Sequence, residues 1–185
     1  MKLTRTYRRL VRDTTINDTS LLSTDYLNHF NELVMMVEMA ADMPEMLEEA
    51  AGWRFKSYQQ HFADSVFQHK DLAVWAYEHA PDAWRQPMDR CTAALRGRVE
   101  DGLPRLLALH EAGDAAGASA EARAFAQEIG RRLDSLSAII NAAVTPEEAE
   151  TLAEEAESDA LVDHAPAGRE GGAVLGQSDI DKLFE

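Results

Sequence analysis

The sequence predicts an all-α protein, specifically a helical bundle, and three observations support this prediction. Apolar residues recur at steps of three and four over most of the first 143 residues, which places them on one face of successive helices. Helix start signals such as Thr145 followed by Pro146 and two glutamates occur along the chain. No segment shows the persuasive apolar–polar alternation that is typical of a strand.

The first long helix is expected after Asp18, Thr19 and Ser20, which are favourable N-cap residues. It should end before Pro44, which begins a second, short helix. The residues predicted to form its main apolar face are Tyr26, Phe30, Leu33, Val34, Val37 and Ala41.

Methionines form a second apolar face on this helix. Five of the seven in the chain are Met35, Met36, Met39, Met43 and Met46. Methionine commonly fills gaps in cores, so we expect a central helix that is buried on two sides. The alternative is an adaptable docking surface, because thioethers repack around different partners.

Aromatic residues concentrate in residues 53–84, which hold eight of the thirteen aromatic side chains and all three tryptophans. Short helices are expected near 56–67 and 70–79, followed by a turn that lasts to Pro87. Such large side chains usually anchor a core, and a ligand-sensing pocket is the alternative.

A helical hairpin is predicted for residues 87–143, with its first helix kinked or broken at Gly102 and Pro104. Residues 1–143 should thus form a helical body. Residues 144–160 predict an acidic helix with so little apolar surface that it should lie exposed. The composition of 161–176 predicts a flexible linker, and 177–185 a docking peptide.

Charge is distributed unevenly. The net charge is −15, of which −10 falls in the last 42 residues. An acidic chain without clustered Lys and Arg does not suit nucleic acid. One cysteine excludes an intrachain disulfide, and no apolar run is long enough for a signal peptide or a membrane span. We therefore expect a cytoplasmic protein that binds neither membrane nor nucleic acid.

The sequence contains few reactive groups at the spacing of a catalytic or metal site. The six histidines lack the H-x-x-x-H or E-x-x-H spacing of helical metal sites, so we expect no metal and no cofactor. The one cysteine, Cys91, has no histidine near it in sequence, which favours an inert thiol.

Paired acids and amides are a further possibility. Phosphatases of response regulators use an acid and an amide one helical turn apart, and the amide orients the attacking water. The matching pairs are Asp25 with Asn28, Asp64 with Gln68, and Asp82 with Gln86. Pro87 disfavours helical backbone at Gln86, and capping or surface hydrogen bonds explain all three pairs. The pattern therefore favours a protein that is not an enzyme.

The last nine residues carry the clearest functional pattern. Ser178 can cap a helix, with Asp181 as its reciprocal acid and Asp179 near the positive end of the helix dipole. Ile180, Leu183 and Phe184 then fall at i, i+3 and i+4. This is the anchor pattern of a helix that docks into a groove.

The segment GQSDIDKLF resembles the peptide of form L-S-Q-x-E-I-D-x-L-L, with which the flagellar motor switch protein binds the phosphorylated chemotaxis response regulator. The residues that match or conservatively replace its positions are Gln177, Ser178, Asp179, Ile180, Asp181, Leu183 and Phe184. The layout of hairpin, linker and docking helix is similar to the chemotaxis phosphatase family. However, residues 87–143 do not match that family's catalytic stretch.

The resemblance implies a role in two-component signalling or chemotaxis. We expect a non-catalytic adaptor that docks a receiver-domain response regulator, or another motility component, through its C-terminal peptide. The alternatives are an aspartyl-phosphate phosphatase of that regulator and a ligand-sensing helical domain. The sequence leaves a homodimer open.

Overall fold

The computed structural model describes residues 5–163, and residues 1–4 and 164–185 lie outside that part. The described chain is helical, with one isolated bridge between Ile16 and Ser23 and no strand, which confirms the all-α prediction. The elements are α1 (Arg5–Leu10), the 3-10 turn η1 (Thr24–Leu27), α2 (Asn28–Ala40), α3 (Met46–Ala51), α4 (Tyr58–Asp64), α5 (Lys70–Glu78), α6 (Asp82–Glu111), α7 (Ala115–Ile140) and α8 (Pro146–Asp163).

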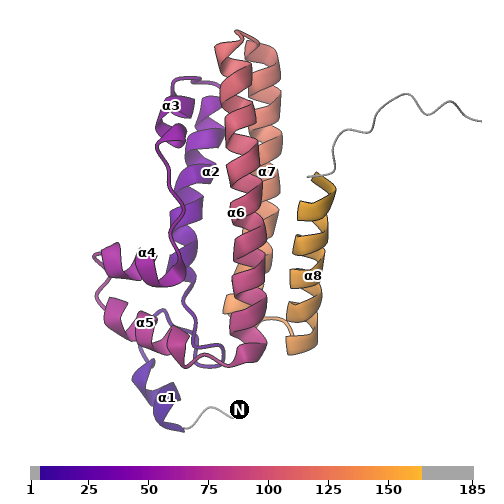
Figure 1. The fold of residues 1–185 in the computed structure, drawn as a ribbon. Helices are drawn as coiled ribbons and strands as arrows, with labels where there is room; N and C mark the ends of the chain where they lie inside the picture. Colours follow the sequence, from indigo (N-terminus) through magenta and orange to yellow (C-terminus); the bar gives the residue numbers. More distant parts are fainter. Residues whose placement is uncertain (1–4, 164–185) are drawn as a thin grey trace, which may run out of the picture.

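A long antiparallel hairpin of α6 and α7 forms the centre of the molecule (Figure 1). Gly113 adopts a φ of 75° in the tight turn between the helices, which a side chain would disfavour. Asp114 then caps α7 by accepting a hydrogen bond from the Gly117 N–H at 2.9 Å. The predicted hairpin is confirmed, although α6 begins at Asp82 rather than near Pro87.

The first hairpin helix was predicted to be kinked or broken at Gly102 and Pro104. The break is wrong, because α6 runs without interruption from Asp82 to Glu111. Gly102 serves close packing: a Cβ there would lie 2.2 Å from a ring atom of Phe125 on α7. Pro104 removes one backbone donor, but its neighbours Leu103 and Leu106 are buried. Packing against α7 holds this turn helical.

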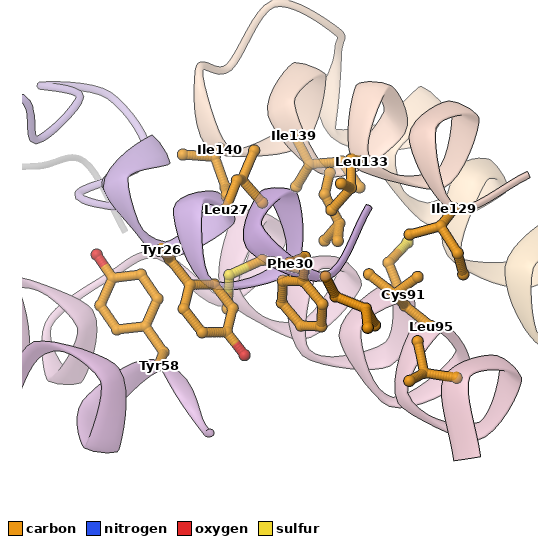
Figure 2. Packing of buried hydrophobic residues seen from close by; sticks show 14 of the residues in the cluster. Tyr26, Leu27, Phe30, Tyr58, Cys91, Leu95, Ile129, Leu133, Ile139 and Ile140 are labelled. Atoms are coloured by element: carbon orange, nitrogen blue, oxygen red, sulfur yellow. The ribbon is translucent and has the colours of Figure 1, made fainter. Parts of the chain in front are cut away.

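Two helices flank the hairpin on opposite sides, with α2 against α7 and α8 against α6 (Figure 1). Figure 2 shows how the core fills the space between α2 and the hairpin: Phe30 lies among side chains from α6 and α7. The fully buried large side chains on which this packing rests include Tyr26, Phe30, Phe62, Leu33, Leu95, Ile129 and Leu136.

The start of the first long helix differs from the prediction. Ser23, rather than Asp18, Thr19 or Ser20, caps η1, and α2 follows directly. The loop before it is tied instead to the end of α7: the Asn17 side-chain amide donates to the Asn141 carbonyl at 2.9 Å, and the Ser20 hydroxyl donates to the Ile140 carbonyl. These bonds satisfy carbonyls that a helix end leaves without partners.

The acidic helix begins as predicted, because Thr145 and Glu148 form a reciprocal capping pair at 2.7 and 3.2 Å. Most of its side chains are exposed, but the expectation that the whole helix is exposed is wrong. Ala149 and Ala153 are fully buried in its contact with α6. The helix also extends to Asp163, three residues into the stretch that was predicted as linker.

Candidate functional site

A polar hollow of about 230 Å³ lies where α2 meets α4 and the segment before it. Its main lining residues are Asn28, His29, Glu32, Lys56, His61 and Asp64. Asn28 and Asp64 were candidates in two separate acid–amide pairs, and the fold brings them to one hollow. The hollow therefore collects an amide, two carboxylates, a lysine and two imidazoles.

Hydrogen bonds hold the segment before α4 against η1. The Tyr26 hydroxyl donates to the Lys56 carbonyl at 3.0 Å, and the Ser23 N–H donates to the Tyr58 hydroxyl oxygen at 2.8 Å. A capping box between Ser57 and Gln60 starts α4 immediately afterwards. Lys56 and the first turn of α4 are thus fixed relative to α2.

His29 forms the inner wall of the hollow. Its Nε2 accepts a hydrogen bond from the Lys56 N–H at 3.0 Å, so its proton resides on Nδ1. Its ring stacks on Trp53 with a centroid distance of 4.6 Å. Burial, with smaller contributions from His61 and Lys56, lowers the pKa of His29 to about 4. His29 is therefore neutral at pH 7 and structural.

The charged groups of the hollow lie toward its rim. Lys56 Nζ pairs with Asp64 Oδ2 at 2.9 Å, and both side chains are substantially exposed. His61 lies 5.9 Å from His29 between ring centroids, and burial lowers its pKa as well. The hollow thus has an uncharged aromatic interior and a charged rim.

Asn28 and Glu32 form an acid–amide pair that the sequence analysis missed. They are four residues apart on α2, so they share one face, and both line the hollow. The signal is present in the sequence as N-x-x-x-E, with the amide before the acid. In the three predicted pairs, by contrast, the acid comes first.

The three predicted pairs fare differently. Asp25 does not line the hollow, because its carboxylate accepts hydrogen bonds from the Thr15 and Ser23 hydroxyls. Asp64 ends α4, so Gln68 lies beyond the helix and the predicted one-turn pairing of Asp64 with Gln68 is wrong. The helix ends there because Ser65 has an extended backbone, which terminates α4.

The third pair was disfavoured because of Pro87, yet α6 begins early enough to include Gln86. Asp82 and Gln86 therefore do lie one turn apart. Asp82 is bound instead to Arg85, with Oδ1 2.7 Å from a guanidinium nitrogen.

The methionine face differs from the expectation that α2 is buried on two sides. Met36 and Met46 pack against the core, but Met35, Met39 and Met43 are 55%, 38% and 40% exposed. The prediction is wrong for these three because no described element covers the outer face of α2. The alternative, an adaptable docking surface, stays a prediction.

Cys91 is buried, and burial raises the pKa of its thiol to about 11, which agrees with an inert role. Among residues 5–163 no group of three or more His, Cys, Asp or Glu is arranged to hold a metal ion. No helix in this part of the chain has the length and apolarity to cross a membrane.

The predicted docking residues 177–185 fall outside the described residues. A comparison with known proteins found no matching family model, no matching curated protein and no matching solved structure. The functional proposals therefore rest on the residues themselves.

Proposed function

We propose that this protein is a cytoplasmic adaptor that docks a receiver-domain response regulator, or another chemotaxis component, through its C-terminal peptide. The observation that carries the proposal is a sequence spacing: in a helix capped by Ser178, Ile180, Leu183 and Phe184 would form one apolar face.

The expected partner surface is an apolar groove with a basic edge. Ile180, Leu183 and Phe184 fill the groove, and each fully buried side chain contributes about 1.5–3 kcal/mol. Asp179 and Asp181 meet the basic edge and mainly raise the association rate at low salt.

The test is calorimetric titration of the full chain with a receiver domain in its phosphorylated state. Ile180→Ala or Phe184→Ala should weaken binding about tenfold or more, and Ser178→Ala should cost only about 0.5–2 kcal/mol. Val66→Ala is the matched control, because Val66 is a fully exposed apolar residue of the body. If Ile180→Ala and Phe184→Ala bind every chemotaxis partner as tightly as the parent does, the motif is a coincidence.

A second candidate function is hydrolysis of the regulator's aspartyl phosphate, and the hollow between α2 and α4 favours it. In this reaction water attacks phosphorus, the bond to the aspartyl oxygen breaks, and phosphate and a free carboxylate result. Asn28 would orient the water, and Glu32 one turn further on would position it or accept its proton. The Lys56 ammonium at the rim would offset phosphoryl charge.

Dephosphorylation assays on a phosphorylated receiver domain distinguish the two functions. A phosphatase should lose at least about tenfold in rate in Asn28→Ala and in Glu32→Gln, which corresponds to about 1.4 kcal/mol. Asn31→Ala and Glu38→Gln are matched controls, because both residues are exposed on α2 and neither lines the hollow. If the protein binds the receiver domain but does not accelerate dephosphorylation, the phosphatase function is wrong and only the adaptor function remains.

A further inference from the structure

A second pocket, of about 210 Å³, opens between α6 and aromatic residues of η1, α4, α5 and the segment before α4. Its aromatic wall consists of Tyr26, Phe55, Tyr58 and Tyr77. The rings are close to one another: Tyr58 lies 5.2 Å from Tyr26 and 4.8 Å from Tyr77 between centroids. Figure 2 shows Tyr26 and Tyr58 side by side at this edge of the core.

Thr92 of α6 lines this pocket and is only 7% exposed. Its Oγ1 is buried and has no hydrogen-bond partner with acceptable geometry, although it lies close enough to the Tyr26 hydroxyl to affect the pKa of Tyr26. A buried hydroxyl without a partner is uncommon, because it loses its hydrogen bonds to water without replacement. The arrangement leaves one hydrogen-bonding position open toward the pocket.

The charge at the pocket comes from two α6 residues, Asp89 and Arg96. Arg96 is already engaged: its Nε donates to Glu100 at 2.8 Å, and its guanidinium lies 5.1 Å above the Phe55 ring. Asp89 accepts a hydrogen bond from the Tyr77 hydroxyl at 2.9 Å and forms no ion pair among the described residues. Burial raises the pKa of Asp89, and the Tyr77 hydrogen bond and the nearby Arg85 charge lower it in part; Asp89 is the acid that the pocket offers to a cationic ligand.

We propose that this pocket binds a small organic amine with an aromatic or apolar body. The ammonium group pairs with Asp89, and the body packs against Tyr58, Tyr77 and the inner side of Phe55. A polar group on the body then bonds to the Thr92 hydroxyl. Aromatic faces attract cations through their electron-rich surface, so the wall and the carboxylate favour the same charge. An anion of the same shape would meet Asp89 and is excluded.

Tyramine is a suitable probe, because it carries an ammonium group, an aromatic ring and a phenol hydroxyl. Calorimetric titration of the full chain with tyramine should show saturable binding, and 3-(4-hydroxyphenyl)propionate, which has a carboxylate in place of the ammonium, should show none. Asp89→Asn should weaken tyramine binding about tenfold or more. Glu111→Gln is the control on the same helix, since Glu111 is exposed and lies outside the pocket.

Thr92→Val tests the open hydroxyl position separately. The exchange keeps the side chain's shape and removes a hydroxyl that has no partner, so the unliganded variant should melt at the same or a higher temperature. The same variant should bind tyramine about threefold to tenfold more weakly.

Three outcomes would overturn the proposal: no heat of binding up to about 5 mM tyramine, equal binding of the carboxylate analogue, or undiminished binding by Asp89→Asn. The first of these, together with a more stable Thr92→Val variant, would show that the unpaired Thr92 hydroxyl does not serve a ligand.

Discussion

The two helices that flank the hairpin are held to it by different forces. On the α2 side, Tyr26, Phe30 and Leu33 are fully buried and fill the space against the hairpin. On α8, the small side chains of Ala149 and Ala153 are fully buried, and Leu152 and Ala156 are partly buried against the core. There Arg90 of α6 instead reaches Glu150 and Glu157, the latter at 2.7 Å. One scaffold thus docks α2 by burial of large side chains, and α8 by small apolar side chains together with ion pairs.

Charged residues are arranged differently on the two sides. Residues 13–53, which contain α2 and α3, include no lysine or arginine. On the opposite side the hairpin carries arginines. There the Nε of Arg98 and a terminal guanidinium nitrogen of Arg132 both donate to the Glu128 carboxylate, at 2.8 and 3.1 Å. The acidic helix α8 pairs with that side through Glu150 and Glu157, whereas on the α2 side Asp42, just beyond the end of α2, pairs with Arg123 of α7. Salt and acid should therefore affect the two sides differently.

Replacing Phe30 with alanine should have the largest effect. Phe30 is fully buried, so we expect a loss of about 3–5 kcal/mol in the free energy of unfolding, measured by urea denaturation. Phe62→Ala should behave similarly, while Trp75→Ala should cost less because Trp75 is only partly buried. A loss below about 1 kcal/mol for Phe30→Ala would show that apolar burial does not hold α2.

Mild acid should weaken the α2 side first. Burial lowers the pKa of His29 to about 4, so between its ordinary value of 6.5 and about 4 the unfolded chain binds a proton that the folded chain does not. Stability should fall with decreasing pH over this window, by at most about 1.4 kcal/mol per pH unit for this residue. His29→Gln, whose amide oxygen can still accept the Lys56 N–H, should flatten the profile. An unchanged slope would contradict the role assigned to His29.

The α8 side should respond in a lower pH window and to salt. The hydrogen bond from Arg90 lowers the pKa of Glu157 below its ordinary value of 4.5, so the contribution of this pairing is present above that value and is lost as the pH falls through the lowered pKa. Arg90→Met should speed hydrogen exchange in α8 and leave α2 unchanged, and high salt should do the same to the parent protein. Equal exchange in both proteins at low salt would show that the alanine contact alone suffices.

Removing residues 164–185 should have the smallest effect. The acidic charge and linker-like composition of this segment predict that it does not pack on the body, so the melting temperature should not change. The control is a chain that ends at residue 144, which also lacks α8 and should melt lower. A decrease of several degrees in the longer chain, corresponding to about 1 kcal/mol, would show that the segment packs on the body.

Sequence patterns predicted the helices and their caps better than they predicted the tertiary contacts between helices. The hairpin and the Thr145–Glu148 cap follow from local spacing, and both are present. The docking of α8 was missed because alanines at i and i+4 carry little hydrophobic signal. Gly102 was interpreted as a break because its reason, the ring of Phe125, lies 23 residues away in sequence.

The hollow between α2 and α4 could be predicted only in part. Asn28 and Asp64 were candidates, but their neighbours Glu32, Lys56 and His61 come from two segments with no shared periodicity. What joins them is the pair of hydrogen bonds from Tyr26 and to Tyr58, which tertiary packing creates. The spacing within one helix, N-x-x-x-E, was readable from the sequence.

The pairing of α2 with α7 has a consequence for synthesis on the ribosome. Ala40, the end of α2, and Ile140, the end of α7, are separated by 100 residues. At about 5–20 residues per second, α2 leaves the ribosome some 5–20 seconds before the helix that covers Tyr26, Phe30 and Leu33 is complete. During that interval its apolar face is available to chaperones and to other nascent chains. Products that stop before residue 115 never cover it, so they should be the forms that aggregate or are degraded.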